Sequence, residues 1–544
     1  MAGDCLIQVK FDRFGIATLI FIFIFAVLIV TNADIGVTWD EPAYFAASES
    51  YMSWFAQAFS LPEVALQPDM ITHAWQINKE HPPLDKIWSG LIWSITRNFT
   101  DDISAHRLGN MLLSAILAGL LFLWMRDVYG VTAGLVAVGA LFTMPRFFFH
   151  AHLAALDVPA AFSVFITTYL FWKTMDRKHW AWGLPLGVVW GLALATKINA
   201  VFVPVTLGLW LICFKRDLRL FLRLVIMGVS AIPVFFMVWP WLYVDTIKRI
   251  FEYIGFITTD HWQIGQYYLG NFYMPPPWHF GFVMIWAVVP LGLTFLYFLG
   301  IVRAIIWKQD QALGLLLFLS ALVPILAIST GQSMVYDNDR LMMVSFPFLA
   351  ALAGIGFVWL ISGLKKLTLK KHSLILSRVG YGVIILLAFI PQLVTMVKLY
   401  LHFLSFYSQG VNGLVGATRK GLESTYWCET YQLALPIINE QAKAGDRIWA
   451  DPWSHDVLIY YQMAGLLRDD LVIIAEVDVE SVFGPDAPMA RRYPMSAADW
   501  WIFQHRQTTL GDKGKNSPIL SELSKHEVVY KYSFDGVPIM TLYK

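Results

Sequence analysis

The chain has 544 residues and a formal net charge of +1, and 57% of its residues are hydrophobic while only 15% are charged. Soluble domains carry about 25% charged residues, so this composition excludes an ordinary soluble protein and indicates a chain embedded in a membrane. The charge balance gives no sign of a nucleic-acid partner. Cys5, Cys213 and Cys428 are too dispersed for a disulfide framework or a thiolate metal site.

The apolar segments predict an all-α polytopic membrane protein with about 11 transmembrane helices. A helix needs about 20 mostly apolar residues to cross a bilayer. The candidate spans lie at about 14–33, 103–125, 131–147, 157–173, 181–196, 199–214, 221–243, 279–302, 312–329, 341–361 and 379–399. The first is long and lacks a small-residue cleavage site, so we interpret it as a retained anchor.

Lysine and arginine residues concentrate in alternate loops between these spans. The basic loops lie near residues 10–13, 126, 173–178, 215–223, 303–308 and 365–378. Cytoplasmic loops are enriched in Lys and Arg, so the N-terminus is predicted to be cytoplasmic. An odd number of spans then places the C-terminus on the external side, in the periplasm or outside the cell.

Three external segments are too long to be simple connectors, and they lie at 34–102, 244–278 and 400–544. Loops of this length are usually functional. The last segment is polar and contains strand-like runs at 471–475 and 528–532, with helical stretches between them. We therefore predict a transmembrane domain at 1–399 and an external, soluble α/β domain at 400–544.

The first external segment begins with two adjacent carboxylates, Asp40 and Glu41, followed by Pro42. Paired carboxylates at a membrane surface are costly unless they are solvated, paired or used in chemistry. Asp40 is a candidate general base that takes a proton from an attacking hydroxyl. The structural alternative is that Asp40 caps a helix that begins with Glu41 and Pro42.

The same segment contains the run Asn78-Lys79-Glu80-His81-Pro82-Pro83-Leu84-Asp85-Lys86. The proline pair restricts the backbone, so His81 and Lys86 are expected to be held in place. Lys86 suits a phosphate at the membrane surface, and its alternative is an ordinary loop lysine near lipid headgroups. Arg107, early in the second span, is expected either to face the bundle interior or to extend to the interface.

Further polar side chains gather at external turns, and they are Arg146, His150, His152, Asp157, Lys197 and Arg340. A histidine–carboxylate set can bind a divalent metal, but no spacing here is diagnostic, so a metal is the less favoured interpretation and no other cofactor is expected. The structural alternative for Arg340 is an ion pair with Asp337 or Asp339. Carboxylates and cations on one face would activate an acceptor and hold a lipid phosphate.

The order of these motifs resembles the protein O-mannosyltransferase superfamily, which includes the family 39 glycosyltransferases and the bacterial transferase that adds aminoarabinose to lipid A. The resemblance rests on Asp40-Glu41, on His81-Pro82-Pro83-Leu84 with Lys86, and on Leu156-Asp157-Val158-Pro159. It covers about residues 10–400 and includes Ala195-Thr196-Lys197 and the loop of Arg340. In the tail, Gly413 to Tyr426-Trp427 is similar to a segment of prokaryotic members.

The resemblance implies a GT-C fold, a polyprenyl-phosphate-linked sugar donor and inversion at the anomeric carbon. It implies that loop 34–102 holds catalytic motifs, with Asp40, Glu41 and Asp157 as the acidic residues of the reaction. It also implies that Lys86 and Arg107 bind the donor phosphate, to which we add Lys197 and Arg340, with His81 and His152 nearby. No β-trefoil insert of the eukaryotic protein mannosyltransferases is present, so the acceptor stays open between protein, lipid and glycan.

Two alternatives stay open at this point. A polytopic transporter or lipid flippase would also be hydrophobic, but such proteins often show repeated halves and polar sites at the midplane of the bilayer. Here no repeat is evident and the polar groups lie on one face. A transferase that moves a whole oligosaccharide or a phospho-group would keep the enzyme class and change the donor.

Overall fold

The structure is a computed structural model that describes residues 13–260, 264–306, 311–331, 335–367, 373–400, 402–450, 454–475, 482–483 and 490–544. Cys5 and parts of the basic loops at 10–13, 303–308 and 365–378 lie outside these residues. For the residues that the structure describes, the prediction of a mostly helical membrane protein with a C-terminal α/β domain is confirmed.

Each predicted span coincides with helical structure. Five helical stretches of the described residues are long and apolar enough to cross a membrane, and they are Arg13–Asn32, Asp102–Tyr129, Leu218–Val238, Arg340–Leu364 and Gly380–Leu399. The corresponding elements are α1 (Arg13–Asn32), α6 (Asp102–Tyr129), α12 (Leu218–Val238), α17 (Phe346–Leu367) and α18 (Ser373–Leu399). The remaining spans form α7 (Val131–Phe142), α9 (Asp157–Thr174), α10 (Gly183–Thr196), α11 (Phe202–Cys213), α15 (Leu291–Ile306) and α16 (Gln311–Ile328).

Two predicted spans are not single helices, which corrects the sequence analysis. The span at 131–147 divides into α7 and a short α8 (Pro145–His150), and the span at 279–302 divides into α14 (Phe280–Val288) and α15. A proline follows each break, at Pro145 and Pro290. Proline has no backbone N–H and clashes with the preceding turn, so the helix ends before it.

The helices α15 and α17 pack with their backbones in direct contact. A Cβ atom added at Gly300 would lie 2.0 Å from the carbonyl oxygen of Leu352, and one added at Gly356 would lie 1.9 Å from that of Leu296. Small residues at such crossings are typical of helix packing inside a bilayer, where close van der Waals contact replaces the hydrophobic effect.

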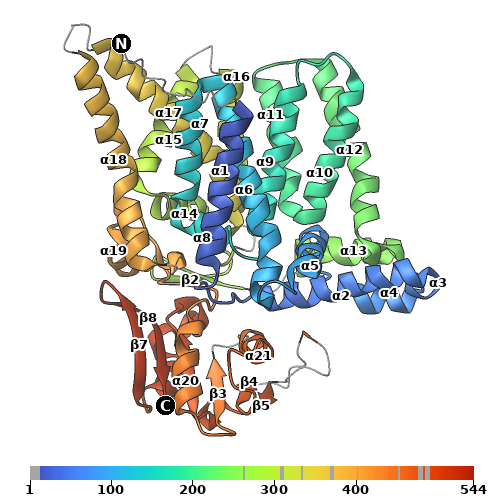
Figure 1. Cartoon of the computed structure of the whole chain (residues 1–544), viewed down its shortest axis with the longest axis vertical. Coiled ribbons are helices and arrows are strands. Elements are labelled where there is room, and N and C mark those ends of the chain that lie inside the picture. Colours follow the sequence, from blue (N-terminus) through green and yellow to red (C-terminus); the bar gives the residue numbers. More distant parts are fainter. Residues whose placement is uncertain are drawn as a thin grey trace, which may run out of the picture.

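The first external segment folds into helices that run crosswise to the long ones (Figure 1). These are α2 (Glu41–Ser60), α3 (Pro62–Ala65), α4 (Pro68–Trp75) and α5 (Leu84–Thr96), with α13 (Thr246–Gly255) of the second external segment beside them. Aromatic contacts hold them together. Tyr51 of α2 stacks on Trp75 of α4, with ring centroids 4.1 Å apart. The second segment also forms a hairpin of β1 (Gln266–Tyr268) and β2 (Asn271–Tyr273).

The tail forms a six-stranded sheet with the strand order β5-β4-β3-β6-β8-β7. Its strands are β3 (Arg447–Ala450), β4 (Val472–Ala475), β5 (Arg491–Arg492), β6 (Trp500–Gln504), β7 (Val528–Phe534) and β8 (Val537–Tyr543). The strands β5, β4, β3 and β6 run parallel to one another. The strand β8 pairs antiparallel with both β6 and β7. Its helices are α19 (Gly413–Arg419), α20 (Leu435–Gln441), α21 (His455–Met463) and α22 (Pro518–Leu523).

The tail lies at the end of the helical part where the crosswise helices also gather (Figure 1). Backbone bonds join the two parts, including Trp39 N–H to the carbonyl of Trp427 at 3.1 Å. A Cβ atom at Gly36 would lie 2.1 Å from the carbonyl oxygen of Glu429, so only glycine fits at this contact. The division near residue 400 follows the end of α18 at Leu399 and stays a prediction, because buried residues of both parts share common cores.

Candidate active site

The guanidinium of Arg340 lies at the centre of a cluster of buried charges. Its Nε donates to Asp157 Oδ2 at 2.9 Å and its Nη1 donates to Asp337 Oδ2 at 3.2 Å. Its Nη2 forms a short ion pair with Asp40 Oδ2. Arg340 is only 4% exposed. One cation therefore joins the external segment before α2, the start of α9 and the loop before α17.

Asp157, the first residue of α9, is held by a second cation. Its Oδ1 accepts a hydrogen bond of 2.6 Å from Nζ of Lys197, which follows α10 in an extended conformation. His150 Nδ1 lies 3.6 Å from Asp157 Oδ2. The structure thus brings together four residues that the sequence analysis treated separately, which are Asp40, Asp157, Lys197 and Arg340.

The tail and the loop before α17 complete the cluster. Asp337 accepts hydrogen bonds from Arg506 Nη2 at 2.7 Å and from Trp427 Nε1 at 2.9 Å. The guanidinium carbon of Arg340 lies 4.2 Å from the centre of the Trp427 ring, a cation–π contact. The pairing of Arg340 with Asp337, which was its structural alternative, therefore coexists with its contacts to Asp40 and Asp157.

Arg146 and Asp339 form a further buried ion pair beside this set. Arg146 also donates from Nε to the carbonyl of Phe406 at 3.1 Å and lies over the ring of Tyr407. The cluster then has four carboxylates and four cations, so its formal charges balance. Its members are Asp40, Asp157, Asp337 and Asp339 with Arg146, Lys197, Arg340 and Arg506.

Asp40 does not act as a helix cap. It precedes α2, but its side chain makes no capping hydrogen bond. Its Oδ2 instead accepts from Tyr44 OH at 3.2 Å in addition to the ion pair with Arg340. The side chain is 24% exposed, so an acceptor can reach it. Burial raises the pKa of Asp40 and the charge of Arg340 opposes this rise. Both the position and the electrostatics suit a general base.

Glu41 and Arg107 form a separate pair, and both side chains are fully buried. Arg107 donates to the two carboxylate oxygens of Glu41 at 2.7 and 2.6 Å and to the carbonyls of Ile35 and Gly36 at 2.9 and 2.8 Å. The structure therefore does not bring Arg107 to the Arg340 cluster. Its predicted phosphate-binding role, and the predicted catalytic role of Glu41, stay predictions, and the geometry favours a positioning role for both.

Lys86 is buried in the motif that was predicted to hold it in place. Its Nζ donates to the carbonyl oxygen and to Oδ1 of Asn78, both at 2.8 Å, and to the carbonyl of His81 at 2.9 Å. All three ammonium hydrogens are thus bound within the loop. Burial lowers the pKa of Lys86 to about 7. The ring of His81 lies beside Tyr44, with centroids 6.4 Å apart.

His152 lies outside the cluster and joins two other elements. Its Nε2 is 2.8 Å from the hydroxyl of Thr31 at the end of α1, and its Nδ1 is 2.8 Å from the carbonyl of Phe148 in α8. This arrangement fixes the turn before α9. The carboxylate next to His150 is Asp157, which already forms ion pairs with Lys197 and Arg340. The predicted absence of a cofactor stays a prediction.

Sequence reasoning named Asp337 as an alternative ion-pair partner of Arg340, but it did not identify Trp427 or Arg506 as part of this site. The similarity of the segment ending at Tyr426-Trp427 to prokaryotic transferases was the only signal that pointed to Trp427. Arg506 follows a buried strand and has no motif around it. Its bond to Asp337 spans 169 residues of sequence, which no local pattern reveals.

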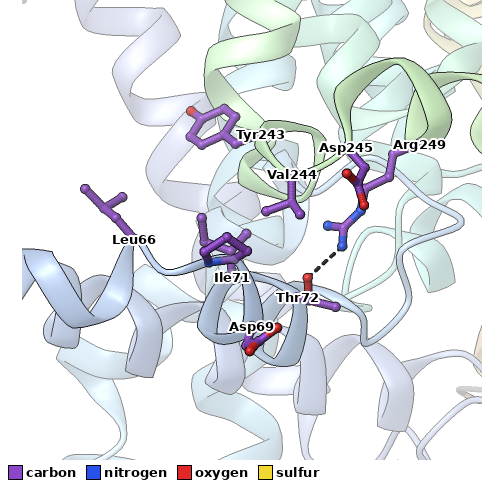
Figure 2. A pocket seen from close by; sticks show the side chains of 9 residues that line it. Leu66, Asp69, Ile71, Thr72, Tyr243, Val244, Asp245 and Arg249 are labelled. Carbon is purple, nitrogen blue, oxygen red and sulfur yellow. Dashed lines mark hydrogen bonds between the residues drawn. The ribbon is translucent and has the colours of Figure 1, made fainter.

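A pocket of about 570 Å³ lies between the crosswise helices, lined by nine residues of which none belongs to the cluster. Figure 2 shows the guanidinium of Arg249 pointing across it to the hydroxyl of Thr72, at 2.6 Å. Arg249 also donates to the carbonyl of Trp241 at 2.7 Å. Leu66, Ile71 and Val244 form its apolar side.

Comparisons with known proteins agree with this fold. A family model for dolichyl-phosphate-mannose-protein mannosyltransferases matches residues 80–243. The apo crystal structure of ArnT from Cupriavidus metallidurans has a TM-score of 0.54 at 14% identity, covering 97% of this chain and 98% of that one. The structure of the same protein bound to undecaprenyl phosphate has a TM-score of 0.51 at 15% identity, covering 98% of both chains. No curated protein sequence matches the chain.

The chain is therefore a multi-pass membrane protein with the GT-C fold. The matched family model and the fold both agree with the resemblance that the order of motifs indicated.

Proposed function

We propose that this protein is an inverting glycosyltransferase that moves one sugar from a polyprenyl-phosphate donor to an acceptor hydroxyl on the non-cytoplasmic face of the membrane. The observation that carries the proposal is the guanidinium of Arg340, which binds both Asp40 and Asp157. It places a candidate base beside two candidate phosphate ligands, Arg340 and Lys197. A protein of the same fold has been crystallised with undecaprenyl phosphate, which supports a lipid-phosphate donor.

In the proposed reaction, Asp40 takes the proton of the acceptor hydroxyl while the oxygen of that hydroxyl attacks the anomeric carbon of the sugar. The new C–O bond forms opposite the breaking bond to the phosphate oxygen, so the configuration inverts. The lipid phosphate leaves with the bonding electrons, and the sugar passes through an oxocarbenium-like state, as in glycoside hydrolysis. Negative charge grows on the leaving phosphate, so cations beside it stabilise the transition state more than the ground state.

The balance of charges in the cluster gives donor binding a second effect. A phosphate that binds Arg340 and Lys197 replaces carboxylates as their partner. Arg340 opposes the rise that burial causes in the pKa of Asp40. When Arg340 turns to the phosphate, this opposition weakens and Asp40 becomes a stronger base. The base is therefore strengthened when a donor is in place.

Arg107 and Glu41 support this arrangement from outside the cluster. Their pair fixes the chain between α1 and α2, since Arg107 binds the carbonyls of Ile35 and Gly36 as well as Glu41. Asp40 immediately precedes Glu41, so its place depends on this turn. We assign both residues to positioning.

The non-cytoplasmic location is supported by two independent features. Basic residues concentrate in the loops at one set of helix ends, which favours a cytoplasmic location for that set. The crosswise helices and the tail gather together at one end of the bundle, and the Arg340 cluster contains residues of this tail (Figure 1).

Reconstitution of the full chain in lipid nanodiscs tests the proposal. The protein is incubated with polyprenyl-phosphate-linked hexose or pentose and with envelope extract from a strain that lacks its gene. We expect release of polyprenyl phosphate and one new sugar on an extract component, detected by mass spectrometry, with inverted configuration by NMR. A nucleotide-linked sugar is the matched control donor. Transfer from that control, or no release from any lipid donor, would contradict the proposal.

A further inference from the structure

A second group of titratable side chains lies where α2 meets the external end of α6, and it shares no member with the Arg340 cluster. Glu49 of α2 and Asp102 and His106 of α6 place their ligand-type atoms within 4.8 Å of one another. His106 Nε2 is 3.3 Å from Glu49 Oε1 and 3.9 Å from Asp102 Oδ2. His106 is fully buried, whereas the side chains of Glu49 and Asp102 are 40% and 43% exposed. The group therefore opens to solvent on one side.

The hydrogen bonds of Ser48 determine which nitrogen of His106 carries a proton. The hydroxyl of Ser48 donates its single hydrogen to the carbonyl of Phe45 at 2.8 Å. Ser48 Oγ is also 3.2 Å from His106 Nδ1, so in this contact the imidazole must be the donor. A neutral His106 then presents the lone pair of Nε2 to the two carboxylates. Three acceptor atoms then converge, and this arrangement suits either a metal ion between them or a second proton on the imidazole.

The ligand-type groups are held in place by their neighbours. Asp102 accepts from Trp93 Nε1 at 2.7 Å through Oδ1 and from Tyr460 OH at 2.6 Å through Oδ2. The imidazole of His106 is stacked between Phe45 and Trp93, with ring centroids 4.4 and 5.1 Å away. Metal-binding histidines almost always donate their second nitrogen in this way, which fixes the tautomer and the ring.

The charge at this place also favours a cation. Within the residues that the structure describes, neither Glu49 nor Asp102 forms an ion pair with a lysine or an arginine. An imidazole and two carboxylates suit zinc and other first-row divalent ions, whereas calcium and magnesium prefer oxygen ligands alone. Tetrahedral ligands about 2.0–2.1 Å from zinc lie about 3.4 Å apart. The spacings of 3.3 and 3.9 Å are close to this value.

We propose that Glu49, Asp102 and His106 form a divalent metal site, with Zn²⁺ as its best-suited ion, that joins α2 to α6 away from the reacting atoms. The inference goes beyond the proposed transfer reaction and does not depend on it. The helix α2 follows directly on Asp40, and α6 carries Arg107. Tyr460 belongs to α21 of the tail, so an ion here would tie together three segments that surround the candidate active site.

Metal binding to the full chain in detergent tests this site. The protein is stripped with a chelator, titrated with Zn²⁺, exchanged into metal-free buffer and analysed for bound metal and unfolding temperature. We expect one Zn²⁺ per chain with a Kd of about 10 µM or tighter, and a higher unfolding temperature with the ion than without it. Co²⁺ in place of Zn²⁺ should give visible absorption bands.

Glu49→Gln is the decisive variant, because it keeps the side-chain volume at a partly exposed position and removes one ligand charge. It should bind Zn²⁺ at least about 10-fold more weakly and lose the Co²⁺ bands, while its metal-free form unfolds at the wild-type temperature. Glu63→Gln, at an exposed carboxylate of α3, is the matched control and should bind as wild type. If wild type holds no ion after exchange, or Glu49→Gln binds as tightly as wild type, the site is a protonated histidine between carboxylates and the proposal fails.

Discussion

Asp40 and Glu41 are neighbours at the start of α2, and their side chains have different partners. Asp40 reaches Arg340 and Tyr44, whereas Glu41 accepts five hydrogen bonds, from the backbone and hydroxyl of Thr38, twice from Arg107 and once from Ala154 N–H. A fully bonded carboxylate has no free lone pair for an acceptor proton. The structure therefore separates Asp40, the proposed base, from Glu41, whose bonds hold the turn beside it in place.

Asp40→Asn is expected to lower sugar transfer by about two to four orders of magnitude, because an amide cannot take the acceptor's proton. The change is nearly isosteric and Arg340 keeps its ion pairs with Asp157 and Asp337, so the unfolding temperature should stay close to wild type. Donor binding should not weaken, because the lost carboxylate competes with the phosphate for Arg340. Initial rates of transfer, with donor affinity measured separately, check this. If the variant keeps more than about a tenth of wild-type transfer, Asp40 is not the base, and Asp157 becomes the residue to test.

Glu41→Gln should act on stability. It removes one partner of a buried ion pair, which typically costs about 3–5 kcal/mol, because Arg107 is left as an uncompensated buried charge. We expect a lower unfolding temperature and a lower yield of folded protein. Thermal unfolding in detergent measures the effect, and Glu63→Gln serves as the exposed control. A variant with wild-type unfolding temperature and strongly reduced transfer would instead give Glu41 a catalytic role.

Lys86 should make donor binding depend on pH. Burial lowers the pKa of this ammonium to about 7, so its charge is lost as pH rises through that value. Donor affinity should therefore fall between about pH 6 and 8 if Lys86 binds the phosphate. Stability should change in the opposite sense: above about pH 7 and up to about 10.4 the unfolded lysine is protonated and the folded one is not, so stability rises with pH.

Two variants separate phosphate binding by Lys86 from its role in the loop. Lys86→Ala should abolish the pH dependence and weaken donor binding. Asn78→Ala removes one of the loop acceptors and keeps the ammonium. If Asn78→Ala reproduces the whole loss of donor affinity, Lys86 only holds the loop. Equilibrium binding of a fluorescent polyprenyl phosphate over a pH series distinguishes the two cases.

The helices could be predicted because bilayer crossing requires long apolar segments, and each candidate span has a helix. Their interruptions could not be predicted from proline alone. Pro145 and Pro290 follow breaks, whereas Pro233, Pro324 and Pro391 lie inside α12, α16 and α18. The same residue type gives both outcomes, because neighbouring elements decide whether the freed backbone groups are satisfied.

The segment of the tail around Trp427 should contribute to transfer. Trp427 covers the guanidinium of Arg340 and donates to Asp337. Trp427→Phe keeps an aromatic ring and loses the donor, whereas Trp427→Leu loses both contacts. We expect kcat/KM to fall about 10-fold for Phe and about 100-fold or more for Leu, as partners of a buried cation are lost. Equal, wild-type rates in both folded variants would show that the tail takes no part.

At the scale of the whole molecule, the two predicted domains share their cores. Trp427, Leu414 and Ile539 of the tail pack in the same cluster as the membrane helices, and Val37 and Phe45 pack with the tail. The motifs before residue 400 located most of the charged cluster. The local spacing pointed to the pair of Asp337 with Arg340. The sequence could not reveal the contribution of Trp427 and Arg506, because contacts between distant segments leave no periodic pattern.

The positive-inside distribution predicts that the tail is external. One reporter works only in the periplasm or outside the cell, and we expect it to be active when it is fused after Lys544. A reporter that works only in the cytoplasm should be inactive at the same position. A fusion at residue 215 to 216, in a predicted cytoplasmic loop, is the opposite control. Activity of the cytoplasmic reporter at Lys544 would mean that one span is miscounted. The spans between residues 131 and 214 would be the first to re-examine.

The ion pair between Asp40 and Arg340 joins residues that are 300 positions apart in sequence. Ribosomes add about 5–20 residues each second, so Asp40 emerges roughly 15–60 s before its partner is made. Arg506 and Trp427 follow later still. The ion pair of Asp40 with Arg340 can form before the tail is complete, whereas the bonds of Asp337 to Trp427 and Arg506 cannot. Synthesis of the tail is the step that completes the cluster, and a product that stops before Trp427 would lack the bonds of Asp337 to Trp427 and Arg506.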